Sequence, residues 1–391
     1  MACVMMYIMR MGSRNAMNEE RDQQEFRKNY RKILGIKIPH MDTVNAVMRV
    51  ISNDQLQELQ QKLVRILLDK RVFHKFRMLD KYFLIAIDGT GVFNFVDQPY
   101  SECPYKTSKH GKVSYHQNVV EAKLICANGF SISLSSEWIT NEDGQAKQDC
   151  EYKASIRLME KLKTAFPRLP ICVIMDGLYL KYPILKTIKS YNWEFIMVWK
   201  DKTLYALQDE LAFRLEEGQE KTEHYTDVHN ANSRSEYEFQ YGEEPLQHKD
   251  IDVYYVKGIK SNINLNQDVE DKQTKYVFMS SIPTTRDTYG PIFDAGCLRW
   301  KIENEGFNAQ KNQGYALHHK MSRKNSTGIK NYYTCLQIAH LLSQLLTLAK
   351  NTVVKKYGTI KALWLYFCSL LRMIDDYKPA NLTLAKYNLR Y

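Results

Sequence analysis

The sequence lacks several features that would place it among membrane, secreted or repetitive proteins. No run approaches the roughly 18 consecutive apolar residues of a membrane span. The first 16 residues are faintly apolar, but they lack the basic start of a signal peptide and contain Arg10. The chain has no internal repeat and no low-complexity tract. These absences predict a globular protein of the cytoplasm without a membrane partner.

The sequence also lacks any C-x-x-C pair, although it contains eight cysteines. Several cysteines lie in apolar runs, such as Cys172 in "ICVIMD" and Cys368 in "LYFCSLL". Scattered cysteines of this kind are typical of reduced, buried thiols in an intracellular protein. We therefore expect neither disulfides nor a zinc site.

Composition permits a sizeable core and favours an acidic partner. The 391 residues are 44% hydrophobic, enough for one large domain with additions or for two or three smaller domains. The formal charge is +11 and the isoelectric point is near 9.0. This balance favours a polyanion such as nucleic acid. Basic enzymes that never bind nucleic acid are also common, so charge by itself does not decide between the two.

The order of predicted elements indicates an α/β fold. Residues 1–80 read as charged helices, which suit either DNA backbone binding or an ordinary helical bundle. Residues 81–200 then predict strand, strand, strand, helix, strand, helix, strand. This is the ribonuclease H-like order, in which helices cover both faces of a mixed sheet. We take 81–200 as the first part of such a catalytic core.

The second half of the chain adds three further regions. Residues 201–285 alternate polar with aromatic or branched residues, which predicts a β-rich insertion that runs into the core strand "KYVFMSS". Residues 286–330 are expected to hold a core helix, beginning at Cys297, and a basic segment. Residues 331–391 read as a C-terminal helical region.

Two predicted strands each run into an Asp-Gly pair. "LIAIDGTGVF" places Asp88 at the tip of an apolar strand, and "ICVIMDGLYL" does the same for Asp176. A turn aspartate is the ordinary explanation of one such pair. Two of them predict carboxylates brought together, with Gly89 and Gly91 allowing the backbone to turn sharply beside Asp88.

A third carboxylate is expected from "CLRWKIENEGFNAQK", residues 297–311. On a regular helix Arg299 and Glu303 lie four residues apart and share one face, whereas Glu305 points away to solvent. Arg299 and Glu303 could also form no more than a surface ion pair. Three carboxylates in apolar surroundings repel one another unless a cation lies between them. Magnesium suits such a site, and a pair of ions would promote phosphoryl displacement.

These residues resemble a known family. "AIDGTG", "IMDG" and "RWKIENEGFNAQK" are similar to the three blocks of DDE transposases of bacterial insertion sequences, in the group with a β-stranded insertion before the Glu. "SYHQNVVEAKLI" and "DCEYKASIRLMEKL" resemble the second strand and first helix of such cores. The spacings agree in kind, with 88 residues from Asp88 to Asp176 and 127 from there to Glu303.

The resemblance implies a DNA recombinase that cuts element ends and joins them to target DNA. It implies Asp88, Asp176 and Glu303 as ligands of two Mg²⁺ ions, with Mn²⁺ as a substitute, and Arg299 as a phosphate contact. It also implies a homodimer on DNA, acting at the bacterial nucleoid. Two positions depart from the family pattern, which has Tyr and Lys where this chain has Gly296 and Gln310. Either Lys311, one step later, takes the lysine role, or that role is lost.

Basic residues surround the predicted site. Residues 299–330 carry seven Lys or Arg against two Glu, a candidate phosphate track that includes Arg299, Lys311, Lys320, Arg323 and Lys324. The core of this stretch, "HHKMSRKNST", reads equally well as a mobile solvated loop. Trp300 is expected in the protein core. Two rival interpretations stay open, a catalytically decayed copy that binds DNA and a related nuclease that cuts without joining.

Overall fold

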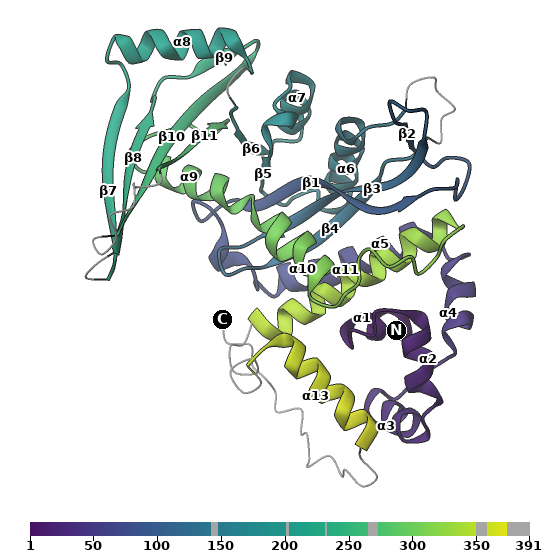
Figure 1. The fold of residues 1–391 in the computed structure, drawn as a ribbon. Helices are drawn as coiled ribbons and strands as arrows, with labels where there is room; N and C mark the ends of the chain where they lie inside the picture. Colours follow the sequence, from purple (N-terminus) through teal and green to yellow (C-terminus); the bar gives the residue numbers. More distant parts are fainter. Residues whose placement is uncertain (142–147, 201–202, 231–232, 265–272, 349–357, 374–391) are drawn as a thin grey trace.

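A mixed sheet forms the centre of the structure, and helices lie on both of its faces (Figure 1). The computed structural model describes the 391 residues except 142–147, 201–202, 231–232, 265–272, 349–357 and 374–391. Within the described residues the sheet has 11 strands, and nine of them follow the order β2-β3-β1-β5-β6-β11-β10-β8-β7. β4 pairs with β3, and β9 pairs with β10. The protein is therefore of the mixed α/β class, as the sequence predicts.

The first five long strands lie where the sequence predicts them. Their bounds are β1 (Phe83–Phe95), β3 (Val113–Ile125), β4 (Ser131–Trp138), β5 (Ile171–Met175) and β6 (Glu194–Val198). β1 is antiparallel to β3 and parallel to β5, and β5 is parallel to β6. The spatial order β4-β3-β1-β5-β6 thus has the first strand at the centre and the second and third on one side of it.

The predicted β-rich segment extends this sheet. Its strands are β7 (Lys221–Asn230), β8 (Ser233–Tyr241), β9 (Leu246–His248), β10 (Ile251–Asn264) and β11 (Gln273–Ser280), and a short β2 (Tyr105–Thr107) borders β3. β11 pairs antiparallel with β6, so the strand expected to join the core does so. The segment also contains a helix, α8 (Tyr205–Glu216), which the alternation of residue types did not predict.

Side chains of β1 alternate between two cores, as the pleat of a strand requires. Ile85 and Ile87 belong to one core, which includes residues of α5 (Asn53–Asp69), α6 (Glu151–Ala165) and α7 (Tyr182–Ser190). Leu84 and Ala86 belong to the core on the other face, with residues of α9 (Tyr289–Leu298). The two faces of the sheet are therefore covered by different helices.

The N-terminal helices and the C-terminal helices share a third core. These are α1 (Ala2–Ile8), α2 (Arg14–Asp22), α3 (Gln24–Leu34) and α4 (Met41–Met48), with α11 (Ser326–Leu348) and α13 (Ile360–Met373). A short 3-10 helix, η1 (His74–Phe76), precedes β1 and is not part of this core. Every residue of α1 is buried. In the described residues no helix combines the length and apolar character needed to cross a membrane. All eight cysteines are free, and six of them are buried, as expected.

Candidate active site

Two aspartates lie where neighbouring parallel strands separate. The parallel pairing of β1 with β5 ends at the Ile87–Met175 pair, and Asp88 and Asp176 are the next residues of each strand path. Ala86 and Ile174, each two residues before one of these aspartates, lie in the core beside α9. Because side chains alternate along a strand, Asp88 points to that same face, and the geometry brings both carboxylates near one another.

Asp88 does not lie at the tip of its strand, contrary to the prediction. β1 continues to Phe95, paired with β3, and a register shift lies between Gly91 and Phe93. Only the β5 partner ends here, because the chain turns into the short helix η2 (Gly177–Tyr179) after Asp176. The strand therefore does not turn sharply at Gly89 or Gly91.

The guanidinium of Arg299 lies between the two carboxylates. Its Nη1 is 3.6 Å from Asp88 Oδ2, and its Nη2 is 3.9 Å from Asp176 Oδ2. The Arg299 side chain is only 7% exposed, and its Nε has no hydrogen-bond partner within the described residues. Both distances exceed hydrogen-bond length, so Arg299 lowers the charge repulsion without occupying the carboxylate oxygens it faces.

The two aspartates differ in their electrostatic environment. Burial raises the pKa of Asp88 to about 6, and Glu151 and Asp176 add to the rise, against the Gly89 amide and Arg299. Burial also acts to raise the pKa of Asp176, but a 2.6 Å hydrogen bond from Lys200 Nζ and other partners hold it below its ordinary value. A cation near Asp88 would therefore stabilise its ionised form.

A third carboxylate beside Asp88 comes from Glu151, in the first turn of α6. A Cβ atom at Gly89 would lie 2.5 Å from the Glu151 carboxyl carbon, so only glycine permits this approach. Tyr179 Oη donates a hydrogen bond to Glu151 Oε1. Glu151 could not be predicted from the sequence, because an acidic residue in a first helical turn is commonplace. Lys200 and Tyr179 could not be predicted either, because their roles depend on the end of β6 and on the turn after Asp176.

Glu303 is not part of this group. The expected regular helix over 297–311 is divided into the end of α9, a π-helical segment η3 (Ile302–Asn308) and α10 (Ala309–Asn312), and α9 begins eight residues earlier than predicted. The wider π-helical turn removes the shared face expected for positions 299 and 303. Arg299 is buried against the aspartates, whereas Glu303 is exposed. Glu305, expected to face solvent, pairs with Lys301 at 2.9 Å.

The two aspartates supply the kind of oxygen ligand that a hard divalent cation prefers, but they are only two. Asp88 and Asp176 supply carboxylate oxygens of the kind that Mg²⁺ prefers. Within the part of the chain that the structure describes, no three His, Cys, Asp or Glu side chains are grouped so that they could hold a metal ion. The predicted set of Asp88, Asp176 and Glu303 is therefore not assembled as a three-ligand group in this arrangement.

The two departures from the family pattern have packing explanations. A Cβ at Gly296 would lie 2.6 Å from the ring of Phe278 on β11, so a tyrosine does not fit there. Gln310 is fully buried and exchanges hydrogen bonds with Gln337 of α11, at 2.7 and 3.1 Å. Position 310 faces this buried polar network, away from solvent, so a lysine there would not reach a phosphate.

The predicted basic residues lie at several places. Arg299 is at the aspartates, and Lys311 is half-buried in α10. Lys320 lies 4.5 Å from the ring centroid of Phe95, near the far end of β1. Arg323 and Lys324 are exposed close by. Trp300 is 48% exposed and lies under the Arg299 guanidinium, so its predicted place in the core is wrong. It stands in the turn after α9, where Arg299 and not Trp300 takes the buried position.

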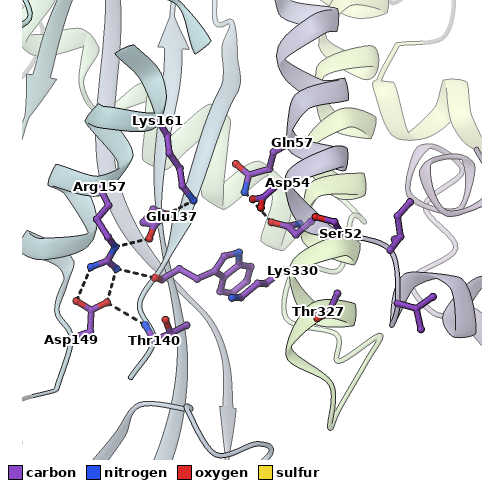
Figure 2. Close-up of a pocket in the computed structure, with 14 residues that line it drawn as sticks. Ser52, Asp54, Gln57, Glu137, Thr140, Asp149, Arg157, Lys161, Thr327 and Lys330 are labelled. Atoms are coloured by element: carbon purple, nitrogen blue, oxygen red, sulfur yellow. Dashed lines mark hydrogen bonds and ion pairs between the residues drawn. The ribbon is translucent and has the colours of Figure 1, made fainter. Parts of the chain in front are cut away.

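A cavity of about 560 Å³ lies elsewhere, between the start of α5, the end of β4, α6 and the start of α11. Figure 2 shows that four of its charged side chains, Glu137, Asp149, Arg157 and Lys161, bond with one another. Arg157 binds Glu137 and Asp149 at 2.7 and 2.6 Å, and Lys161 also binds Glu137. These cations are already neutralised, so the cavity does not offer a site for a polyanion.

Comparison with known proteins adds little to this geometry. No family model matches the sequence, and no curated protein matches it. Among solved structures, the chain is similar to a piggyBac transposase in a synaptic complex with hairpin DNA, at 10% identity and a TM-score of 0.37. The match covers 75% of this chain and 52% of the other, so this chain spans about half the length of that protein. A TM-score this low does not carry an argument about function.

Proposed function

We propose that this protein is a DDE-type DNA transposase of the bacterial insertion-sequence group with a β-stranded insertion. The observation that carries the proposal is the pair Asp88 and Asp176 at the separation of two parallel strands, with buried Arg299 between them. The order β4-β3-β1-β5-β6, with its parallel and antiparallel pairings, supports a ribonuclease H-like core. Such an enzyme would act on chromosomal DNA in the bacterial cytoplasm.

In this proposal Asp88 and Asp176 hold Mg²⁺, or Mn²⁺ as its substitute, and Glu303 completes the ligands of two ions. When bound, the metal would activate a nucleophilic oxygen and stabilise the leaving oxygen of a phosphoryl displacement. The raised pKa of Asp88 supports a cation beside it. Arg299 has unused donor capacity at its buried Nε, which supports contact with a phosphate oxygen.

Glu151 is a second candidate for the third carboxylate. It lies against Gly89, next to Asp88, whereas Glu303 is exposed on the π-helical segment, which itself contacts β1. In the assignment to Glu151, its carboxylate would exchange the hydrogen bond from Tyr179 for a metal ligand.

A nicking assay tests the proposal. The substrate is DNA that carries terminal inverted repeats, found by sequencing the flanks of the gene. Wild-type protein should nick it in the presence of Mg²⁺, and Asp88→Asn or Asp176→Asn should abolish nicking while duplex binding persists. Asp252→Asn, an exposed aspartate on β10 outside the site, is the matched control and should nick normally. Nicking that survives Asp88→Asn would overturn the proposal.

The third ligand is decided by a parallel pair of variants. If Glu303 is the ligand, Glu303→Gln stops nicking and Glu151→Gln does not; the reverse result assigns Glu151. Isothermal titration of Mn²⁺ into each variant supplies a readout that does not depend on turnover. Loss of Mn²⁺ binding should follow the same variant as the loss of nicking.

A catalytically decayed, DNA-binding relic is the second candidate function, because Glu303 is not assembled with the aspartates. The relic would bind duplex DNA but never nick it. A hydrolytic nuclease would nick without producing strand-transfer products, which the same gel separates.

We further propose a homodimer on DNA, because transposition holds two ends together. Light scattering of the complex with end DNA measures its mass and therefore the number of protein chains in it.

A further inference from the structure

A second basic hollow lies far from the aspartates in the chain and brings three segments together. This hollow, the α2–α4 groove, has a volume of about 600 Å³. Its walls are the start of α2, with Arg14, the end of α4, with Arg49, and residues 319–324, with Arg323 and Lys324. The sequence marks the last segment as a candidate phosphate track and the first two only as parts of charged helices. The other two reach it through the tertiary fold.

Residues 317–322 are held against the protein body. Leu317, Met321 and Ser322 are each less than 7% exposed. His318 Nδ1 lies 2.9 Å from the Val92 carbonyl oxygen of β1. The stretch is a loop, as one of the two interpretations expects, and buried residues anchor it between exposed ones. The cations of the groove therefore flank side chains that pack against the protein body.

The groove has an excess of positive charge that its own walls do not neutralise. Five of its lining residues are Lys or Arg, and none is Asp or Glu. Within the described residues only Arg14 among these five has an acidic partner, Asp42 at 3.1 Å. The contrast with the cavity of Figure 2 is direct, because there Arg157 pairs with Glu137 and Asp149, and Lys161 pairs with Glu137. Uncompensated guanidinium and ammonium groups on a fixed surface are the usual footprint of phosphate binding.

The neighbouring histidine supports the same conclusion. Burial, together with Arg323 and Arg14, lowers the pKa of His319 on the groove wall. The two arginines disfavour a proton on His319, which agrees with a wall whose positive charge comes from Lys and Arg side chains.

We propose that the α2–α4 groove binds the phosphate backbone of duplex DNA beside the cleavage site, a proposal that rests on the function proposed above. Lys320, on the groove wall, contacts Phe95, seven residues along β1 from Asp88. At ~3.3 Å per residue that path is about 23 Å, or up to about seven base pairs of duplex. The groove thus holds the flank of the DNA while the aspartates face the scissile phosphate.

A charge-neutralising triple variant tests the groove. Arg49, Arg323 and Lys324 are exposed and make no side-chain ion pair or hydrogen bond within the described residues, so R49Q/R323Q/K324Q should fold normally. The matched control is K70Q/K75Q/R168Q, three exposed cations that precede β1 and β5 and so lie at the opposite edge of the sheet. Circular dichroism and thermal unfolding verify that both variants fold.

The measurement is fluorescence anisotropy of a labelled duplex DNA of mixed sequence over a range of salt concentrations. Each lost phosphate contact lowers the slope of log affinity against log salt by about 0.9, so the groove variant should lose roughly 2 to 3 units of slope. The control variant should keep the wild-type slope. On end DNA, hydroxyl-radical footprinting should show protection lost within about seven base pairs of the nick in the groove variant alone.

The outcomes distinguish a failure of the groove proposal from a failure of the transposase proposal. Equal slopes for the groove variant and the wild type would overturn the groove proposal and leave the transposase proposal standing. Equal losses in the groove variant and the control would also overturn it, because the effect would then be one of net charge. An RNA duplex of the same sequence, bound more tightly through the same three cations, would overturn the assignment to DNA. Absence of duplex binding by the wild type would overturn both proposals.

Discussion

Replacing Gly89 by alanine tests the contact that brings Glu151 beside Asp88. The added Cβ would lie 2.5 to 2.8 Å from the three carboxyl atoms of Glu151, well inside van der Waals contact. The backbone at Gly89 does not have a positive φ, so the methyl group introduces no backbone strain. The Glu151 carboxylate therefore has to move away, and with it goes the hydrogen bond from Tyr179.

The expected change in the free energy of unfolding of G89A follows from two opposing effects. A hydrogen bond to a charged group contributes about 1.5 to 3 kcal/mol, which G89A forfeits. Alanine in place of glycine raises the free energy of unfolding by about 0.4 to 1 kcal/mol, because it restricts the conformations of the unfolded chain. G89A should therefore lower the free energy of unfolding by about 1 to 2 kcal/mol. In an E151A background the clash is absent, so G89A should become neutral or slightly stabilising, a coupling of about 1.5 to 3 kcal/mol.

Urea denaturation of the wild type, both single variants and the double variant measures this coupling, provided that the m-value stays constant. Gly91→Ala is the matched control. Its Cβ would meet only Asn118 Oδ1, at 3.4 Å, so G91A should be neutral or stabilise by up to about 1 kcal/mol, and by the same amount in either background. Additive effects of G89A and E151A would refute the contact, and with it the case for Glu151 as a site residue.

Two further predictions concern the interior. Burial, with Lys123 and Arg10 nearby, holds the pKa of His340 well below its ordinary value, so folded His340 stays neutral while the unfolded chain protonates below about pH 6.5. Stability should fall by about 1.4 kcal/mol per pH unit below that value, and H340Q should remove this slope in denaturation at successive pH values; equal slopes would contradict the assignment. G296A should cost about 1 to 3 kcal/mol because its Cβ would lie 2.6 Å from the Phe278 ring, and less in an F278L background; a stability unchanged by G296A would contradict the packing reason for this departure.

Much of the sheet could be predicted from the sequence, because strands and their faces follow from local alternation and from short apolar runs. The strands β3, β4, β5 and β6 were predicted near their observed bounds, as was β11, which joins them, whereas β1 continues past its predicted end at Asp88 to Phe95. Asp88 and Asp176 could be predicted as neighbours, since the carboxyl ends of adjacent parallel strands meet at one edge of a sheet. Helix α8 escaped prediction because its sequence has little apolar periodicity and lies among strand-like segments.

The sequence by itself determined the α/β class, the order of the core elements along the chain and the two Asp-Gly pairs, because each is a pattern of residues close together in the chain. Tertiary structure alone decided the rest. Glu151 reaches Asp88 only because a glycine lets a distant helix approach, and Arg299 lies between the aspartates because α9, which it ends, packs on that face of the sheet. The α2–α4 groove likewise joins Arg14 and Arg49 to residues 319–324. Contacts between segments so far apart depend on how helices pack on the sheet, and no local pattern records that packing.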